Sequence, residues 1–242
     1  MVPAGGDGFR RGDLSRNLFV MRFPPPDVSR LLIVGAGGFG REVLQWARDA
    51  WPADNRRVCG FLSADADNLV SHEDAPPVIA DPATFVPEPH DGLLLAIGIP
   101  GVRRHVAETL LARGARFVTL IHPSAIVAPT AAIGPGSIVC PAAVVSDAAA
   151  VGRCVLVNYH ASIAHDSSVG DYAVLSPYAA LAGGARVSED CFLAMHATVG
   201  PTVTLGPRTK VAANSCALRD APADSLVHGV PGRTAPLPEP GT

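Results

Sequence analysis

A histidine followed directly by an aspartate, His165-Asp166, is the pair in this sequence best suited to proton transfer. A neutral imidazole can accept a proton near pH 7, and an adjacent carboxylate can fix the tautomer of the ring and raise its basicity. Asn158 and His160 precede the pair within the segment VNYHASIAHD. A single histidine is more often an exposed polar residue than a base, so the pair needs a structural context before it is assigned a role.

A glycine-rich motif near the N-terminus is suited to binding a phosphate. Gly35, Gly37 and Gly40 satisfy the spacing G-x-G-x-x-G between an apolar segment at 31–34 and an expected helix. Glycines let the backbone approach a phosphate closely, and the N-terminus of the helix favours its negative charge. A tight turn that only packs a helix against a strand would show the same spacing.

The segment around this motif alternates between expected strands and helices, which predicts a parallel α/β sheet. Helices are expected after the motif and at 102–113, and strands at 31–34, 58–62, 77–80, 92–98 and near 117–121. The segment has about 90 residues, one mononucleotide-binding half rather than two. Since no acidic residue ends the second strand at Ser63, a nucleotide carrying a single sugar is a better candidate ligand than a dinucleotide.

A six-residue unit repeats without interruption from Ala125 to Asp220. The third place of each unit is Val, Ile or Leu in all but the last, and the first place is nearly always Ala, Ser, Thr, Cys or Val. An amphipathic helix would show a period of 3.6 and a half-buried strand a period of 2. A strict period of six predicts a parallel β-helix built from hexapeptides, in which the fifth and sixth places, including His165 and Asp166, point outward at turns.

Charge and cysteine usage narrow the class of protein. A net charge of −3 and a pI near 6.2 give no electrostatic footprint for nucleic acid or an anionic membrane. The five cysteines form no C-x-x-C motif and are expected to be small buried residues in a reducing compartment. No apolar run approaches the roughly 18 residues of a membrane span. We therefore expect a cytoplasmic protein, with a disordered arm at 1–29 and a loose tail at 234–242.

Several motifs in order along the chain resemble the bacterial sugar acetyltransferases of the NeuD/PglD type. They are LLIVGAGGFGREV, LLLAIGIPGVRRHV, IHPSAIV, VNYHASIAHDSSVGD, the AGG of 182–184 and the final GVPGR, and together they extend from residue 30 to about 233. The resemblance implies a small Rossmann-like α/β domain at 30–120, followed by an all-β left-handed parallel β-helix of hexapeptide repeats at 121–233.

The same resemblance implies a reaction and a set of site residues. The reaction is acetyl transfer from acetyl-CoA to a nucleotide-linked amino sugar, a UDP- or GDP-4-amino-4,6-dideoxyhexose, by a homotrimer with active sites between subunits and without a metal. His165 would be the general base and Asp166 its adjacent acid. The acceptor would contact Gly37, Gly38, Phe39, Ser63, Gly98 and Asn158, and acetyl-CoA would lie near Val174, Gly183, Met195 and Ala213. Three departures from the family pattern fall at Val174, at Met195-His196 and at Ser63-Ala64.

Three hexapeptides form one coil in such β-helices, so residues eighteen apart are expected to stack. Asp147 then lies one coil below His165 and is a second candidate to orient its ring. His160, Tyr178, His196 and Asn214 form a second stack. We interpret it as a polar corner at a subunit contact rather than a metal stripe, because imidazole and phenol rings pack well together.

Three other functions are compatible with parts of the sequence. A sugar O-acetyltransferase of the sialic-acid type would use the same base, and a nucleotide-sugar-binding trimer without catalysis would use the same fold. A nicotinamide-dependent oxidoreductase is disfavoured by the half-sized α/β domain. The base of the nucleotide and the configuration of the sugar stay open.

Overall fold

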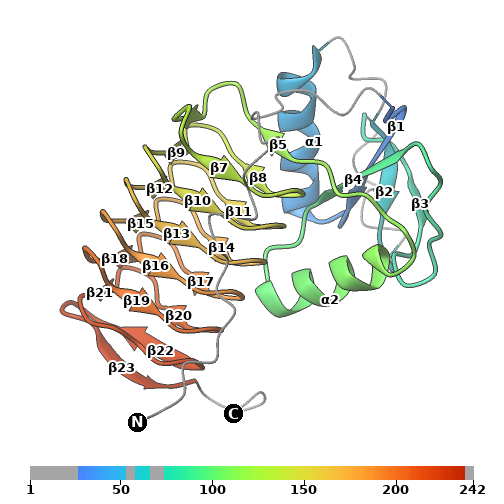
Figure 1. The fold of residues 1–242 in the computed structure, drawn as a ribbon. Helices are drawn as coiled ribbons and strands as arrows, with labels where there is room; N and C mark the ends of the chain where they lie inside the picture. The colour runs from blue at the N-terminus through green and yellow to red at the C-terminus, as the bar shows by residue number, and fades with distance from the viewer. Residues whose placement is uncertain (1–26, 53–57, 66–73, 238–242) are drawn as a thin grey trace.

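The structure, a computed structural model, describes residues 27–52, 58–65 and 74–237 of the 242 in the chain. Figure 1 shows a small α/β domain beside the first coils of a long prism. The arm predicted at 1–29 lies, up to residue 26, outside the described residues. Val28, within that prediction, is instead fully buried against the α/β domain.

The α/β domain is a four-stranded parallel sheet with strand order β3-β2-β1-β4. The Rossmann-like arrangement expected from the alternation is confirmed. The two central strands, β1 and β4, are buried over Leu31–Val34 and Gly92–Leu95 and are apolar there, as expected of a parallel sheet covered on both faces. Its elements are β1 (Arg30–Val34), α1 (Gly38–Ala50), β2 (Val58–Leu62), β3 (Val78–Ala80), β4 (Asp91–Leu95) and α2 (Pro100–Leu111).

The strand expected near 117–121 does not complete this sheet. Phe117 makes only an isolated bridge with Leu93 of β4, whereas β5 (Leu120–Ile121) pairs with β8 (Ile138–Val139). Leu120 and Ile121 hold the second and third places of a hexapeptide that precedes Ala125. The hexapeptide repeat therefore begins one unit before Ala125, and its first strand lies at the expected boundary between the two domains.

The prism is built from two-residue strands, each at the second and third places of a unit. Every strand pairs in parallel with the strand eighteen residues away, as Ser162 does with Ala180. Together with two longer strands near the C-terminal end, they form three sheets of five, six and eight strands. The strands are β6 (Ile126–Val127), β7 (Ala132–Ile133), β8, β9 (Val144–Val145), β10 (Ala150–Val151), β11 (Leu156–Val157), β12 (Ser162–Ile163), β13 (Ser168–Val169), β14 (Val174–Leu175), β15 (Ala180–Leu181), β16 (Arg186–Val187), β17 (Phe192–Leu193), β18 (Thr198–Val199), β19 (Thr204–Leu205), β20 (Lys210–Val211) and β21 (Cys216–Ala217).

Two places in each unit fill the interior of the prism. The first place holds a small residue such as Ala143 or Ala161, and the third holds a branched one such as Val145 or Ile163; all four are fully buried. The sixth place almost always adopts a left-handed backbone, with φ of +58° at Asp166. This conformation usually favours glycine, yet most sixth places carry a side chain. The chain turns each corner through these residues.

The last coil ends differently from the others. β22 (Ser225–His228) adds in parallel to β20, and β23 (Arg233–Pro236) returns antiparallel to β22. The loose tail expected from residue 234 therefore begins with part of a strand. Residues 238–242 lie outside the described part of the chain.

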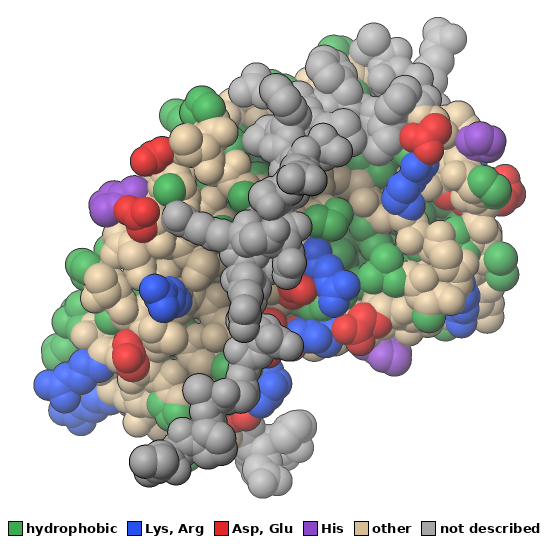
Figure 2. Space-filling model, viewed as in Figure 1, with side chains coloured by type: hydrophobic (Ala, Val, Ile, Leu, Met, Phe, Trp, Pro, Cys, Tyr) green, Lys and Arg blue, Asp and Glu red, His purple; other side chains and the backbone are tan. Residues whose placement is uncertain are grey.

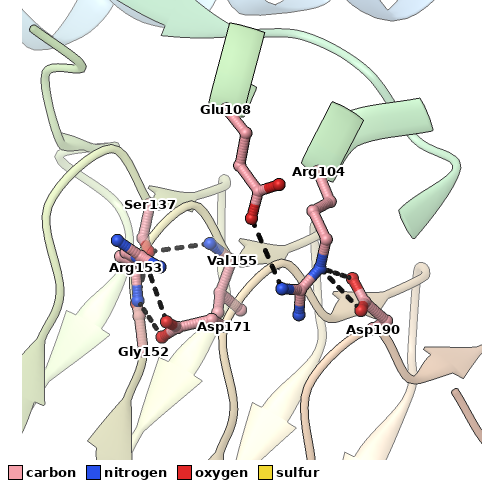
Figure 3. A network of polar contacts seen from close by, with 8 residues as sticks. All are labelled: Arg104, Glu108, Ser137, Gly152, Arg153, Val155, Asp171 and Asp190. Atoms are coloured by element: carbon pink, nitrogen blue, oxygen red, sulfur yellow. Dashed lines mark hydrogen bonds and ion pairs between the residues drawn. The ribbon is translucent and has the colours of Figure 1, made fainter. Parts of the chain in front are cut away.

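The α/β domain covers the eight-stranded sheet. Residues of α1 and β1 pack into one cluster with Ile138, Cys140, Leu156 and Val174 from that sheet. Helix α2 lies along the corner between the eight- and five-stranded sheets, where Arg104 reaches down to Asp190 with an N···O separation of 2.7 Å (Figure 3). Among the described residues, the hydrophobic clusters that join the two domains include no strand residue of the other two sheets.

A buried arginine connects the two domains. Arg103 of α2 is fully buried. Its Nη1 donates to the carbonyl oxygens of Leu95 and Ile97, at 2.8 Å each, and its Nε donates to the carbonyl of Cys154 at 2.5 Å. Burial lowers the pKa of Arg103 to about 10, so the guanidinium is still charged at neutral pH. It ties the end of β4 to the β-helix through backbone carbonyls.

Replacing Arg103 by methionine should destabilise the protein. The change leaves three carbonyl oxygens without their donor, and each hydrogen bond to a charged group contributes about 1.5–3 kcal/mol. Part of this loss is offset because the charge no longer has to be buried, so we expect a net loss of about 2–4 kcal/mol. Urea unfolding measures it. Arg113→Met is the matched control, because Arg113 also donates to carbonyls but is exposed; equal stability of the two variants would contradict the assignment.

Candidate active site

His165 and Asp166 lie at the corner between the six-stranded and the five-stranded sheets, after β12 and before β13. His165 Nδ1 lies 2.9 Å from Asp166 Oδ2. A carboxylate only accepts hydrogen bonds, so Nδ1 carries the hydrogen of this bond and Nε2 of the neutral ring keeps its lone pair. Both side chains are about two-thirds exposed, 67% and 63%. The arrangement presents a proton acceptor at an open surface.

Gly183, one coil above His165, provides the space for the imidazole. A Cβ added to Gly183 would lie 2.6 Å from both Cε1 and Nε2 of His165. The backbone of Gly183 is not left-handed, in contrast to that of Gly184, whose φ is +69°. Glycine at 183 is therefore required for space rather than for conformation. The resemblance to the acetyltransferases implies that Gly183 contacts the coenzyme, and that role stays a prediction.

Asp147 does not orient the His165 ring as expected. Its carboxylate accepts a hydrogen bond from Thr130 Oγ1. Its backbone carbonyl accepts the N–H of Asp166 at 3.0 Å. Asp147 therefore supports the backbone of the pair, while the carboxylate that contacts the ring belongs to Asp166.

Two glycines of the glycine motif are open to solvent at the carboxyl edge of the parallel sheet. Gly37 is the N-cap of α1 and Gly38 its first residue. A Cβ on Gly37 would meet nothing within 4 Å, and one on Gly38 only Arg41 Nη2 at 3.8 Å. Gly35 and Gly40 are packed instead, because a Cβ on Gly40 would lie 2.0 Å from the carbonyl oxygen of Gly35. The middle of the motif is therefore free to approach a ligand.

The other residues predicted to contact the acceptor differ in accessibility. Gly98, in the loop after β4, is exposed, and a Cβ there would also meet nothing within 4 Å. Ser63 follows β2 at the same edge, and its Oγ accepts the N–H of Asp65 at 3.2 Å. Phe39 is partly buried and packs edge-on against Trp46, with ring centroids 5.9 Å apart. In this structure Phe39 acts as a packing residue of the domain.

The structure corrects the prediction that Val174 lines a coenzyme channel. Its side chain is 2% exposed and lies beneath the α/β domain with Leu156 and Cys140. Since Val174 occupies a closed interface within one chain, it cannot contact a coenzyme along the prism surface. The sequence differs from the family pattern at Val174, and this difference therefore lies in the protein core.

Three other predicted residues lie together at a different corner from His165. Met195, Ala213 and Asn158 all occupy the corner between the eight- and six-stranded sheets. Met195 is 51% exposed, and Asn158 Oδ1 accepts the N–H of Tyr159 at 2.8 Å. In one chain, these residues and Gly183 belong to two separate surfaces.

This second corner carries an aromatic stack. The rings of His160 and Tyr178 stack with centroids 4.8 Å apart and planes 8° apart, and those of Tyr178 and His196 at 4.8 Å and 7°. The stacked corner expected from the eighteen-residue spacing is confirmed; its contact with another subunit stays a prediction. Within the described ranges, no three His, Cys, Asp or Glu side chains lie together as a metal site requires.

Two arginines were not recognised from the sequence. Arg103 looks like an ordinary helical residue, and only the packing of α2 on the β-helix reveals its burial. Arg186 lies in a groove of about 660 Å³ that also contains Asp166. The repeat itself could have drawn attention to Arg186. It holds an outward second place in a stack whose other members, Ala132, Ala150, Ser168 and Thr204, are small.

Charges of both signs are interspersed on the face shown in Figure 2, and no single basic patch dominates it. Among the described residues, no helix has the length and apolar character needed to cross a membrane.

Gly183→Ala should displace the His165 ring at little cost in stability. The clash involves the end of a flexible side chain, so the ring can rotate away while the coil stays intact. A crystal structure of the variant would show a longer contact between Nδ1 and Asp166.

Gly134→Ala provides the contrast for that variant. There the added Cβ would lie 2.5 Å from backbone atoms of Gly152, and such overpacking costs about 1–3 kcal/mol. An unmoved imidazole in Gly183→Ala would show that glycine is not needed for the position of the ring.

Hexapeptide coils that form a left-handed parallel β-helix, joined to a small Rossmann-like domain and carrying an exposed histidine–carboxylate pair, define an acyltransferase of the hexapeptide-repeat class. Residues 30–110 match the family model described as the PglD N-terminal domain. No curated protein matches the chain.

Solved structures extend the likeness to both domains. The acetyltransferase domain of PglB from Neisseria gonorrhoeae is 26% identical, covers 86% of this chain and 100% of its own, and has a TM-score of 0.76. The same domain has been solved with acetyl coenzyme A. PerB from Caulobacter crescentus, solved with CoA and GDP-perosamine, is 28% identical, covers 88% of this chain and 99% of its own, and also has a TM-score of 0.76. The resemblance to NeuD/PglD-type sugar acetyltransferases is confirmed.

Proposed function

We propose that this protein transfers the acetyl group of acetyl-CoA to the amino group of a nucleotide-linked amino sugar. The observation that carries the proposal is the hydrogen bond of 2.9 Å between His165 Nδ1 and Asp166, which leaves Nε2 free to accept a proton at an exposed corner. The similar structures of the PglB domain with acetyl coenzyme A and of PerB with CoA and GDP-perosamine support both co-substrates.

The reaction is a direct transfer in which His165 acts as general base. The amine nitrogen of the sugar attacks the thioester carbonyl, and Nε2 accepts a proton from that nitrogen. A carbon–nitrogen bond forms, the carbon–sulfur bond breaks, and coenzyme A leaves as a thiolate that the protonated imidazole can neutralise. Asp166 stabilises the charged ring. Backbone N–H groups at the corner stabilise the oxyanion of the tetrahedral intermediate.

The acceptor is held by the open edge of the α/β domain in this proposal. Gly37 and Gly38 offer backbone N–H groups at the start of α1, and Gly98 lies at the same edge. Ser63 contributes its backbone from the end of β2. The nucleotide of the acceptor is GDP or UDP, and PerB, described as a perosamine N-acetyltransferase with its GDP-linked sugar, supports the N-acetyl form of the reaction.

The complete site requires a second copy of the chain. Gly183 lies at the His165 corner, whereas Met195 and Ala213 lie at the opposite edge of the six-stranded sheet. The outward side chains of that sheet carry no charge; they are Ile126, Val144, Ser162, Ala180, Thr198 and Cys216. Ile126 is 66% exposed. We place this sheet at the contact between copies of a homotrimer, so that coenzyme lies between the Gly183 corner of one copy and the Met195 corner of the next.

His165→Ala should lower turnover by about 10²–10⁴-fold if the ring is the general base. Asp166→Asn should give a smaller loss, because the base stays and only the orientation and charge of its partner change. Free thiol released from acetyl-CoA, with UDP- and GDP-linked amino sugars as acceptors, measures both effects.

His105→Ala is the control for these variants, since His105 is an exposed histidine of α2. Near-normal turnover of His165→Ala would contradict the assignment of the base. If the wild-type chain releases no thiol with any acceptor, the protein is a nucleotide-sugar-binding module instead. Thiol release with hydroxyl acceptors alone would identify the O-acetyltransferase alternative.

A further inference from the structure

The corner that carries His165 continues through the later coils of the prism. Strand β12, which precedes His165, is followed in the six-stranded sheet by β15, β18 and β21. Figure 1 shows these strands in succession toward the C-terminal end of the prism. The fifth places that come after them are His165, Gly183, Pro201 and Arg219. One line of residues thus connects the proposed base with an arginine three coils away.

The part of this corner between His165 and Arg219 carries neither a charged nor a large side chain. Its fourth, fifth and sixth places are Ala182, Gly183, Gly184, Gly200, Pro201 and Thr202. The other two corners differ, because the one beside α2 carries the ion pair of Arg153 and Asp171 and the other carries the aromatic stack. Of the three corners, only the His165 corner offers a long neutral chain an unobstructed path that ends at a cation.

Arg219 is exposed and has no ion pair among the residues that the structure describes. The acid next to it in sequence is Asp220, whose Oδ1 accepts the N–H of Thr204 at 2.7 Å. This hydrogen bond holds the carboxylate toward the five-stranded sheet, to which Thr204 belongs. Arg208, at a different corner, is paired with Asp224 through an Nε to Oδ1 separation of 2.6 Å. Of these two arginines, Arg219 is the one available to an anionic ligand.

The charges along the corner determine the direction in which an anionic substrate can extend from His165. Asp147 lies one coil before the base, and Asp166 lies beside it. Arg219 lies on the opposite, C-terminal side. An anionic group that is joined to the reacting atoms by a long neutral chain is therefore repelled from one side of His165 and attracted to the other.

The distance from His165 to Arg219 matches the donor of the proposed reaction. Neighbouring coils are one strand spacing apart, so three coils separate the two Cα atoms by about 14 Å. In acetyl-CoA the neutral pantetheine arm between the thioester and the diphosphate is as long as about four extended residues, about 15 Å. The nucleotide of the acceptor does not compete for this position, because the proposed function places it at Gly37 and Gly38 of the α/β domain.

We infer that Arg219 binds the diphosphate of acetyl-CoA, while the pantetheine arm follows the uncharged corner and the thioester reaches His165. This inference rests on the proposed function and names a residue that holds the donor. The planar guanidinium offers two parallel N–H donors to phosphate oxygens. Arg219 is then a positioning residue, because an anchor three coils from the base determines how far the thioester extends toward Nε2.

Calorimetric titration of the full-length protein with coenzyme A tests the inference without turnover. Arg219→Gln should weaken the binding of coenzyme A by about 5–30-fold, because charge-assisted hydrogen bonds at an exposed site are lost. Arg219→Lys should recover part of that affinity, since it keeps the charge but not the planar pair of donors. Dephospho-coenzyme A lacks the 3′-phosphate but keeps the diphosphate, and its binding should weaken to the same extent in Arg219→Gln.

Two acetyl donors separate a positioning role from a merely structural one. Arg219→Gln should raise the KM for acetyl-CoA by about the same factor as it weakens coenzyme A binding. S-acetylpantetheine has nearly the whole arm but no diphosphate, so its kcat/KM should be the same in Arg219→Gln as in the wild type. A substitution that only damaged the fold would lower the rate with both donors.

Two control variants separate this effect from general electrostatics. Arg208→Gln makes the same change in net charge at an arginine that is paired with Asp224, and it should leave coenzyme A affinity unchanged. Asp220→Asn keeps the oxygen that accepts the Thr204 N–H but removes a negative charge beside Arg219, so coenzyme A should bind slightly more tightly. Thermal unfolding of each variant verifies that the fold is retained.

Unchanged coenzyme A affinity in Arg219→Gln would overturn the inference, and so would an equal loss in Arg208→Gln. A loss with coenzyme A but not with dephospho-coenzyme A would also overturn it, because Arg219 would then bind the 3′-phosphate. Failure of the proposed function gives a different result. In that case the wild type releases no thiol, yet it binds coenzyme A and Arg219→Gln weakens that binding.

Discussion

The eighteen-residue coil is the constraint on which the rest of the structure depends. Each two-residue strand is hydrogen-bonded to strands eighteen residues before and after it, as Ser162 is paired with Val144 and Ala180. The neighbours of every outward side chain are therefore determined by the sequence number alone. The position of the His165 ring next to Gly183 and the aromatic stack of His160 and Tyr178 both follow from this register. A slip of one residue would turn the buried third places outward.

The α/β domain is attached so that it leaves the His165 corner accessible. It covers the eight-stranded sheet and one corner of the prism, where Arg103 donates to Cys154 and Arg104 pairs with Asp190. The His165 corner joins the two other sheets. Within one chain the open edge of the α/β domain and the His165 corner are thus separate surfaces, which supports a site completed by a neighbouring copy.

Much of the fold and the location of the pair could be predicted because the repeat keeps its phase. The period of six placed His165 and Asp166 at a corner and predicted the aromatic stack. The period carries no information about which sheet another domain covers, and the coenzyme contact that the resemblance implies for Val174 falls on a buried residue. It also does not determine hydrogen-bond partners: of the two candidate carboxylates, Asp166 contacts the His165 ring, whereas Asp147 accepts from Thr130. Arg103 became recognisable only once α2 was placed on the β-helix.

The antiparallel return of β23 has a consequence for the solubility of the protein. A parallel β-helix ends in unpaired backbone groups, and such an edge can template the addition of further chains. On the eight-stranded sheet this edge is occupied by β23, which runs against the direction of all the strands beneath it and contains Pro236, a residue without an N–H group. Another coil of the same kind cannot add there in register. The final strand thereby limits end-to-end polymerisation of the prism on this sheet.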